Sequence, residues 1–157
     1  MTVNSPTTPG QILTSAYVNN MPRGVISGTL NTVATLTVAS ITETELFRGP
    51  AFTPAAGRLY RCTYSVGQLS KTTAIGNINI KLRKDSTAGT VLNDSVFSAL
   101  DVGVILPFST SILLTTTEMG TALFTPLICL VANTTGFTAS NTGGYNGTLV
   151  FEDIGAA

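Results

Sequence analysis

The sequence contains no histidine and no tryptophan, and only 10% of its 157 residues are charged. The absence of histidine excludes Ser-His-Asp and Cys-His catalytic sites and any histidine-ligated zinc. Two cysteines, Cys62 and Cys129, cannot complete a structural zinc site by themselves. Glu152 and Asp153 are adjacent carboxylates, but neighbours on a strand point to opposite faces, so we interpret them as a solvated strand end. We therefore predict no catalytic, cofactor-binding or metal-binding residue and expect the protein not to be an enzyme.

The charges that remain are balanced, with eight basic and eight acidic residues and a formal net charge of zero. This balance gives neither a nucleic-acid footprint nor a polybasic membrane patch. The longest apolar runs, such as "LICLVA", fall far short of the roughly 18 residues that a membrane span needs. We predict no nucleic-acid or membrane partner, and synthesis in a cytosol where both thiols stay reduced. A calcium ion in a loop containing Asp85, Asp94 or Asp101 remains an open alternative.

Scarcity of charge is combined with a high apolar content, because 43% of the residues are hydrophobic and the mean hydropathy is +0.36. An ordinary soluble protein has about 25% charged residues, which keep the free monomer dispersed. We interpret the composition as that of a subunit whose surface is covered by copies of itself or by other proteins. A monomer coated with Ser and Thr is the alternative.

Strict alternation of apolar and polar residues marks the middle of the chain. In "RLYRCTYSV" the apolar residues occupy every second position, and "NINIKLRK" repeats the pattern with Lys81 directed to water. A period of two over this length is typical of half-buried antiparallel strands. The predicted core residues are Tyr60, Cys62, Tyr64, Ile78, Ile80, Leu82, Leu149 and Phe151.

Further strands are expected at Val25–Leu30, Val33–Val38, Thr42–Phe47, Val91–Leu100, Ser109–Thr116, Thr121–Val131 and Gly147–Ile154. Turn signals such as "RGPAFTPAAG" and "KDSTAG" separate them. Pro126 inside its strand indicates a bulge or an edge position. Together these features predict an all-β antiparallel sandwich over residues 24–157, a jelly roll of about eight strands.

Residues 1–23 differ from the rest, and we call them the N-terminal arm. Thr14 is a possible N-cap for a short helix, Ser15–Asn20, that ends before Pro22. One or two helical turns are not stable alone in water, so the arm needs a surface to dock on. We favour docking on a neighbouring subunit over docking on its own domain. The predicted assembly residues of the arm are Ile12, Leu13, Tyr17, Val18, Met21, Pro22 and Arg23.

Four stretches together resemble a known group of proteins: "NNMPRGVI", "FTPAAGRLYRCTYSV", "INIKLRKDSTAGT" and "LVFEDIGAA". They are similar to motifs of small β-sandwich virion structural proteins from tailed bacteriophages that infect actinobacteria such as mycobacteria. The corresponding segments are Leu13–Asn19, Pro22–Gly24, Phe52–Arg61, Ile80–Thr90 and Phe151–Gly155. The segment from Val91 to Tyr145 adds nothing to this resemblance.

The resemblance implies a virion component made in the cytoplasm of a host bacterium. Its first candidate role is a capsid decoration or minor capsid protein, bound to the major capsid protein or other virion subunits as a homo-oligomer. A homotrimer is the expectation by analogy with jelly rolls at local three-fold axes. The alternative role is a minor tail or fibre subunit that binds a host-surface glycan, with Tyr145 as the best-placed aromatic residue.

Overall fold

A computed structural model describes residues 20–31, 36–38, 42–71, 76–100, 102–132, 136–140 and 146–157. The described chain is almost entirely β-strand, as the alternating sequence predicts. The strands are β1 (Gly24–Asn31), β2 (Leu36–Val38), β3 (Thr44–Arg48), β4 (Arg58–Lys71), β5 (Gly76–Lys84), β6 (Val91–Leu100), β7 (Ile105–Thr115), β8 (Pro126–Ala132), β9 (Phe137–Ser140) and β10 (Gly147–Ala156). One short helix, α2 (Thr116–Met119), follows β7.

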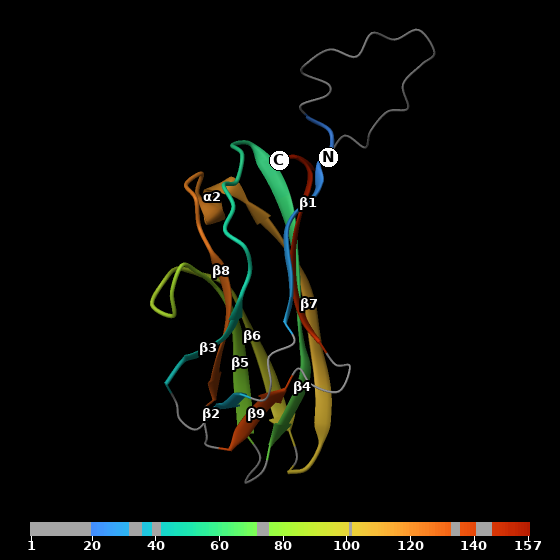
Figure 1. The fold of residues 1–157 in the computed structure, drawn as a ribbon, viewed down its shortest axis with the longest axis vertical. Helices are drawn as coiled ribbons and strands as arrows, with labels where there is room; N and C mark the ends of the chain where they lie inside the picture. Colours follow the sequence, from blue (N-terminus) through green and yellow to red (C-terminus); the bar gives the residue numbers. More distant parts are fainter. Residues whose placement is uncertain are drawn as a thin grey trace, which may run out of the picture.

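The strands form two layers packed face to face (Figure 1). A six-stranded sheet has the order β1-β10-β4-β9-β2, with β7 on the other side of β4, and a four-stranded sheet has the order β3-β8-β5-β6. All strand pairs are antiparallel. The pairs β1–β10, β3–β8, β4–β7 and β5–β6 are nested in the sequence, which is the pairing of a long hairpin rolled into a jelly roll. The predicted fold class is therefore confirmed.

The space between the two sheets holds the hydrophobic core. All eight core residues predicted from the alternation are buried, with at most 2% of each side chain exposed. At the end of the sandwich near β10, Phe52, Phe124 and Phe151 pack as a cluster of tilted and edge-to-face rings, with centroids 4.8 to 6.2 Å apart. Such pairs stabilise a core beyond the area they bury.

Several elements differ from the sequence-based expectations: the described chain forms ten strands instead of about eight, and β8 begins at Pro126 instead of Thr121. Strand β7 begins at Ile105 instead of Ser109, and strand β9 and helix α2 were not predicted. The helix has an N-terminal capping box, in which the Glu118 side chain accepts a hydrogen bond from the backbone N–H of Thr115. It consists of a single turn, so it leaves no hydrophobic period in the sequence.

Pro126 is neither at a bulge nor on an edge strand, which corrects the expectation drawn from it. It is the first residue of β8, and β8 lies between β3 and β5. A proline is tolerated at the first position of a strand because the ladder hydrogen bonds begin after it. The Pro126 carbonyl still accepts a hydrogen bond from the backbone N–H of Gly49, at 2.9 Å.

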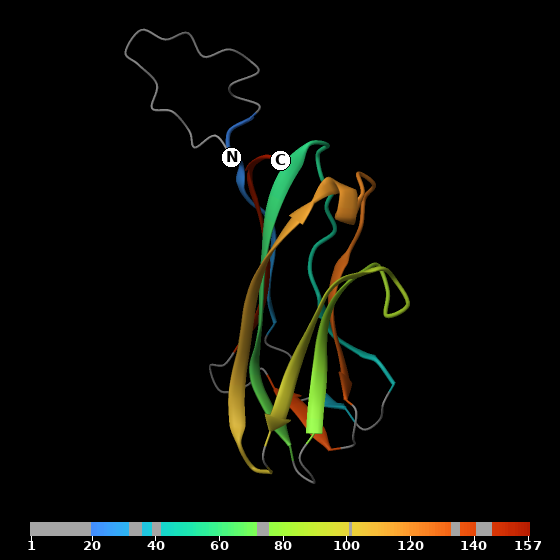
Figure 2. The same cartoon turned by 180° about the vertical axis from the view of Figure 1, so that it is seen from behind.

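The described chain begins and ends at the same end of the sandwich (Figures 1 and 2). A backbone hydrogen bond from Arg23 N to the carbonyl of Asp153, 3.1 Å long, joins the two ends. The turn between β5 and β6 projects from the side of the sandwich in both views. The arm is therefore attached at one defined end of the sandwich.

Candidate assembly site

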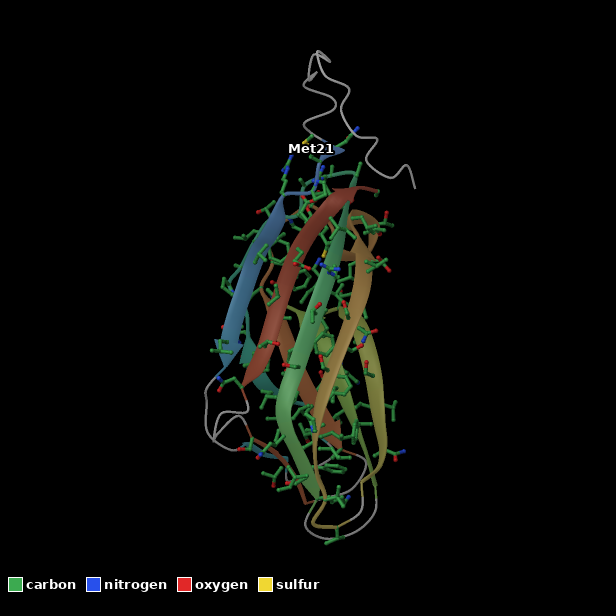
Figure 3. All side chains as sticks on the ribbon, turned by 90° about the vertical axis from the view of Figure 1, so that its right-hand side faces the viewer. Met21 is labelled. Carbon is green, nitrogen blue, oxygen red and sulfur yellow. The ribbon has the colours of Figure 1, made fainter. Side chains whose placement is uncertain are left out.

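The described part of the arm, Asn20–Arg23, meets the sandwich at the end of the six-stranded sheet, and we call it the arm root. Figure 3 shows Met21 at this end, above β1 and β10. The Met21 carbonyl accepts a hydrogen bond of 2.6 Å from Nη2 of Arg58, the first residue of β4. Two hydrogen bonds, one to Met21 and one from Arg23, therefore fix the backbone of the arm root to the folded domain.

The side chain that holds the arm root belongs to a buried ion pair. Arg58 is 4% exposed and Asp153, on β10, is 1% exposed. Arg58 Nε donates to both carboxylate oxygens at 3.1 and 2.9 Å, and Nη2 donates to Oδ1 at 2.5 Å. The backbone N–H of Gly155 also donates to Oδ1, at 3.1 Å. A forked arrangement of this kind satisfies most of the donors and acceptors that burial would otherwise leave without water.

Gly155 lies beside the arm root in a backbone conformation that favours glycine. Its φ of +130° is one that residues with a side chain rarely adopt, and a Cβ at this position would lie 3.4 Å from the carbonyl oxygen of Asn20. The positive φ of Gly155 thus explains why a glycine stands at this position of "EDIGA".

The structure corrects the interpretation of the two adjacent carboxylates. Glu152 and Asp153 do point to opposite faces, but only Glu152 is at the surface, where its Oε2 accepts a 2.6 Å hydrogen bond from Arg61 Nε. Asp153 is buried and belongs to the ion pair with Arg58, so it is not a solvated strand end. Alternation along a strand predicts that one of the two carboxylates faces the core, but not which residue would neutralise it.

Three of the predicted assembly residues lie in the arm root. Met21 is partly buried, Pro22 is exposed, and Arg23 is exposed with its Nε 3.9 Å from Oδ2 of Asp153. The other four predicted assembly residues, and the predicted helix Ser15–Asn20 apart from its last residue, lie outside the described residues; these four are Ile12, Leu13, Tyr17 and Val18. Arg58 and Asp153, which position the arm root, were missed by the sequence reasoning.

The outer face of the four-stranded sheet is highly charged. Arg83 and Lys81 of β5 both donate hydrogen bonds to Glu43, and Lys81 also lies 3.8 Å from Asp94 of β6. Burial alone would raise the pKa of Glu43, but the hydrogen bonds and charges of Arg83 and Lys81 outweigh it, so the pKa lies below its ordinary value. Lys81 does lie on the outer face, as alternation predicts, but its side chain is only 18% exposed.

The two cysteines lie on different sheets. Cys62 of β4 is part of the core between the sheets, whereas Cys129 of β8 pairs with Glu45 and Lys81 in the outward-facing register of the four-stranded sheet. Both thiols are free and buried. Burial raises the pKa of both, that of Cys129 to about 12. Burial of both thiols matches the expectation for two small, structurally inert cysteines.

The aspartates of the possible calcium loops have other partners. Asp85 Oδ1 accepts a 2.8 Å hydrogen bond from the backbone N–H of Thr125, and Asp94 accepts one of 2.8 Å from Asn79. Asp101 lies outside the described residues. Within the described ranges, no group of three acidic or cysteine side chains is placed to hold a metal ion. The same part of the chain contains no helix with the length and apolar character of a membrane span.

The comparisons with known proteins concern the fold alone. No family model matches this chain, and no curated protein matches its sequence. A chain of infectious bursal disease virus, Gt strain, matches with a TM-score of 0.51 and 13% identity, over 88% of this chain and 39% of the viral chain. A chain of the T13 particle of the same virus matches with a TM-score of 0.51 and 12% identity, over 88% of this chain and 37% of its own.

A third solved structure, the C-terminal CBM6 module of LamC from Zobellia galactanivorans, covers 74% of this chain and 98% of its own at 10% identity. Its TM-score of 0.34 is too low to support an argument. This chain spans about two-fifths of the length of the viral chains. The sandwich thus shares its fold with part of these viral chains.

Proposed function

We propose that this protein is a structural, non-enzymatic component of a bacteriophage virion, a capsid decoration or minor capsid protein that binds the head surface as an oligomer. Its fold, which is shared with chains of a viral particle, supports the virion location. Its low charge supports permanent contact with other subunits, because a surface that never faces water needs few charges. The motifs in the first and last segments of the chain support a phage origin.

The observation that carries the proposal is the fixed arm root. The hydrogen bond from Arg58 to the Met21 carbonyl fastens the arm to the rigid end of the sheet. The described arm root is therefore fixed to the domain at the point where residues 1–19 join it. We propose that these residues dock on a neighbouring virion subunit, the major capsid protein in the first instance.

One arm of this length binds weakly, because ordering its backbone opposes the burial of its few apolar side chains. An oligomer that engages several arms at once raises the effective affinity without new contacts. A decoration protein of this design is expected to associate with itself before or during attachment.

No observation on the described residues favours the alternative, a glycan-binding tail or fibre subunit. Sugar-binding surfaces commonly use exposed aromatic rings, and both described tyrosines, Tyr60 and Tyr64, are buried in the core. Tyr145 lies outside the described residues.

The test is attachment to particles that lack this protein. The truncation is placed after residue 19, because removing Met21 and Arg23 would also take the partners of Arg58 and Asp153. We expect full-length protein to occupy the particle in a copy number comparable to that of the capsid subunits, and the truncated protein to remain folded but unattached. A full-length Tyr17→Asp variant, which keeps the arm but charges it, should also attach poorly. Equal occupancy by truncated and full-length protein would refute the role of the arm, and a few copies per particle would favour the tail.

A further inference from the structure

Strands β1, β10, β4 and β7 of the six-stranded sheet lie side by side (Figure 3), and their register sets side chains of its outer face in rows across the four strands. One row reads Val25, Glu152, Arg61, Leu113. The next outward-facing row reads Gly28, Val150, Thr63, Ser111, and the third reads Leu30, Thr148, Ser65, Ser109. Among the described side chains of these rows, Arg61 and Glu152 are the charged ones, and they pair with each other.

Four of the five hydroxyl side chains in these rows bond to one another in pairs. Thr63 and Ser111 share a hydroxyl hydrogen bond of 3.0 Å, and Ser65 and Thr148 share one of 2.7 Å. Burying a hydroxyl is costly when it loses its partner water, and cheap when a protein partner already satisfies it. This face can therefore be covered at low cost.

Apolar side chains flank these hydroxyls and are open to water. Val25 is 63% exposed, Leu30 is 58% exposed and Leu113 is 56% exposed. The first two belong to the edge strand β1 and the third to the edge strand β7. A face with apolar borders and internally bonded hydroxyls has the character of an interface.

The first row is complementary to itself, since it runs apolar, acidic, basic, apolar. We propose that a second copy of this chain covers this face, related by a two-fold axis that runs along the strands between β10 and β4. This axis places β10 of one copy over β4 of the other, and β1 over β7. Each Glu152 then faces Arg61 of the second copy, and each Val25 faces Leu113 of the second copy. In such an isologous contact, each Glu152 and each Arg61 has one oppositely charged partner in its own chain and a second one in the other copy.

The ion pair has capacity for this second contact. Within a chain, only Arg61 Nε and Glu152 Oε2 are joined among the described contacts, which leaves the terminal guanidinium nitrogens and Oε1 for the other copy.

The face is also large enough. Four strands about 4.8 Å apart and eight residues at about 3.3 Å each give a plane of about 500 Å² per copy. Two copies then bury about 1,000 Å², which is where specific interfaces begin.

The other sheet offers an internal control. Glu45 and Arg48 form an exposed pair on β3 of the four-stranded sheet, with side chains 29% and 55% exposed. The corresponding fractions for Glu152 and Arg61 are 28% and 50%. The two pairs thus match in chemistry and exposure and differ in the face that carries them. A two-fold pairing also differs from the three-fold arrangement expected by analogy, so the two can be told apart.

The first experiment is reciprocal charge reversal in the purified full-length protein, followed by sedimentation analysis. We expect the wild type to be a dimer, and Arg61→Glu and Glu152→Arg each to raise the dimer Kd by about a hundredfold, because like charges then face each other. An equimolar mixture of the two variants should dimerise again, since the acidic row of one faces the basic row of the other. Arg48→Glu should leave the dimer unchanged.

A second pair of variants does not involve the ion pair. Leu113→Glu on β7 should weaken the dimer, whereas Val96→Glu on β6, where the side chain is also 56% exposed, should not. A wild-type monomer or trimer at high micromolar concentration, an equal effect of Leu113→Glu and Val96→Glu, or a mixture of charge variants that does not associate would each overturn the proposal. The experiment uses no particle, so its outcome is independent of the proposed attachment to a virion.

Discussion

Replacing Arg58 by methionine removes the guanidinium that neutralises Asp153 and holds the arm root. The Asp153 carboxylate, 1% exposed, would remain inside the protein without its main partner. Removing one member of a buried ion pair costs about 3–5 kcal/mol, because the remaining charge is left uncompensated. Arg48→Met is the matched control, since Arg48 is 55% exposed, pairs with Glu45 outside the proposed dimer face, and an exposed pair of this kind contributes little to stability.

Thermal unfolding followed by far-UV circular dichroism measures the difference. For a domain of this size each kcal/mol shifts the Tm by about 2–4 °C, so Arg58→Met should lower the Tm by about 6–20 °C. The double variant Arg58→Met, Asp153→Leu should be more stable than Arg58→Met, because apolar residues often replace a buried pair at little cost. It should still lose about 2 kcal/mol, since the Met21 carbonyl and the Gly155 N–H lose their partners. The reasoning is refuted if Arg58→Met and Arg48→Met lower the Tm equally.

Two further predictions concern the thiols and the charged face. Burial raises the pKa of Cys62, and that of Cys129 to about 12. The folded protein should therefore not react with a thiol reagent at mildly alkaline pH, whereas both thiols should react after unfolding. A disulfide in the purified protein would contradict this prediction. Glu43 has a lowered pKa through Arg83 and Lys81, so its stabilising effect is complete above the ordinary value of 4.5 and is lost as the pH falls below it. In denaturant titrations over this pH range, Glu43→Gln should show a weaker loss of stability on acidification than the wild type, and parallel curves would contradict the role of Glu43.

Much of the fold could be predicted from the sequence, because the alternation of apolar and polar residues along a strand shows which face of that strand is buried. Tyr60, Cys62 and Tyr64 alternate with polar residues, and all three are in the core. Helix α2 escaped prediction because it has four residues and is stabilised by its cap and its neighbours. Strand β9, also four residues long, is held by pairing with β4 and β2 and not by its own composition.

The candidate site was predictable only in outline. The composition indicates a covered surface, and the sequence of the arm indicates a docking segment. The partner of Asp153 was not predictable, because Arg58 is 95 residues away in the chain and its side chain reaches Asp153 only through the pairing of β4 with β10.

By itself, the sequence determined the all-β class, the inward-facing residues and the scarcity of surface charge, since these follow from the order of side chains along each strand. The tertiary structure alone decided which residues share a row. Val25, Glu152, Arg61 and Leu113 come from four separate segments, and only the strand order β1-β10-β4-β7 sets them side by side. Strand pairing depends on the whole folded chain, so this outer face and its self-complementary row become visible only when the six-stranded sheet is assembled.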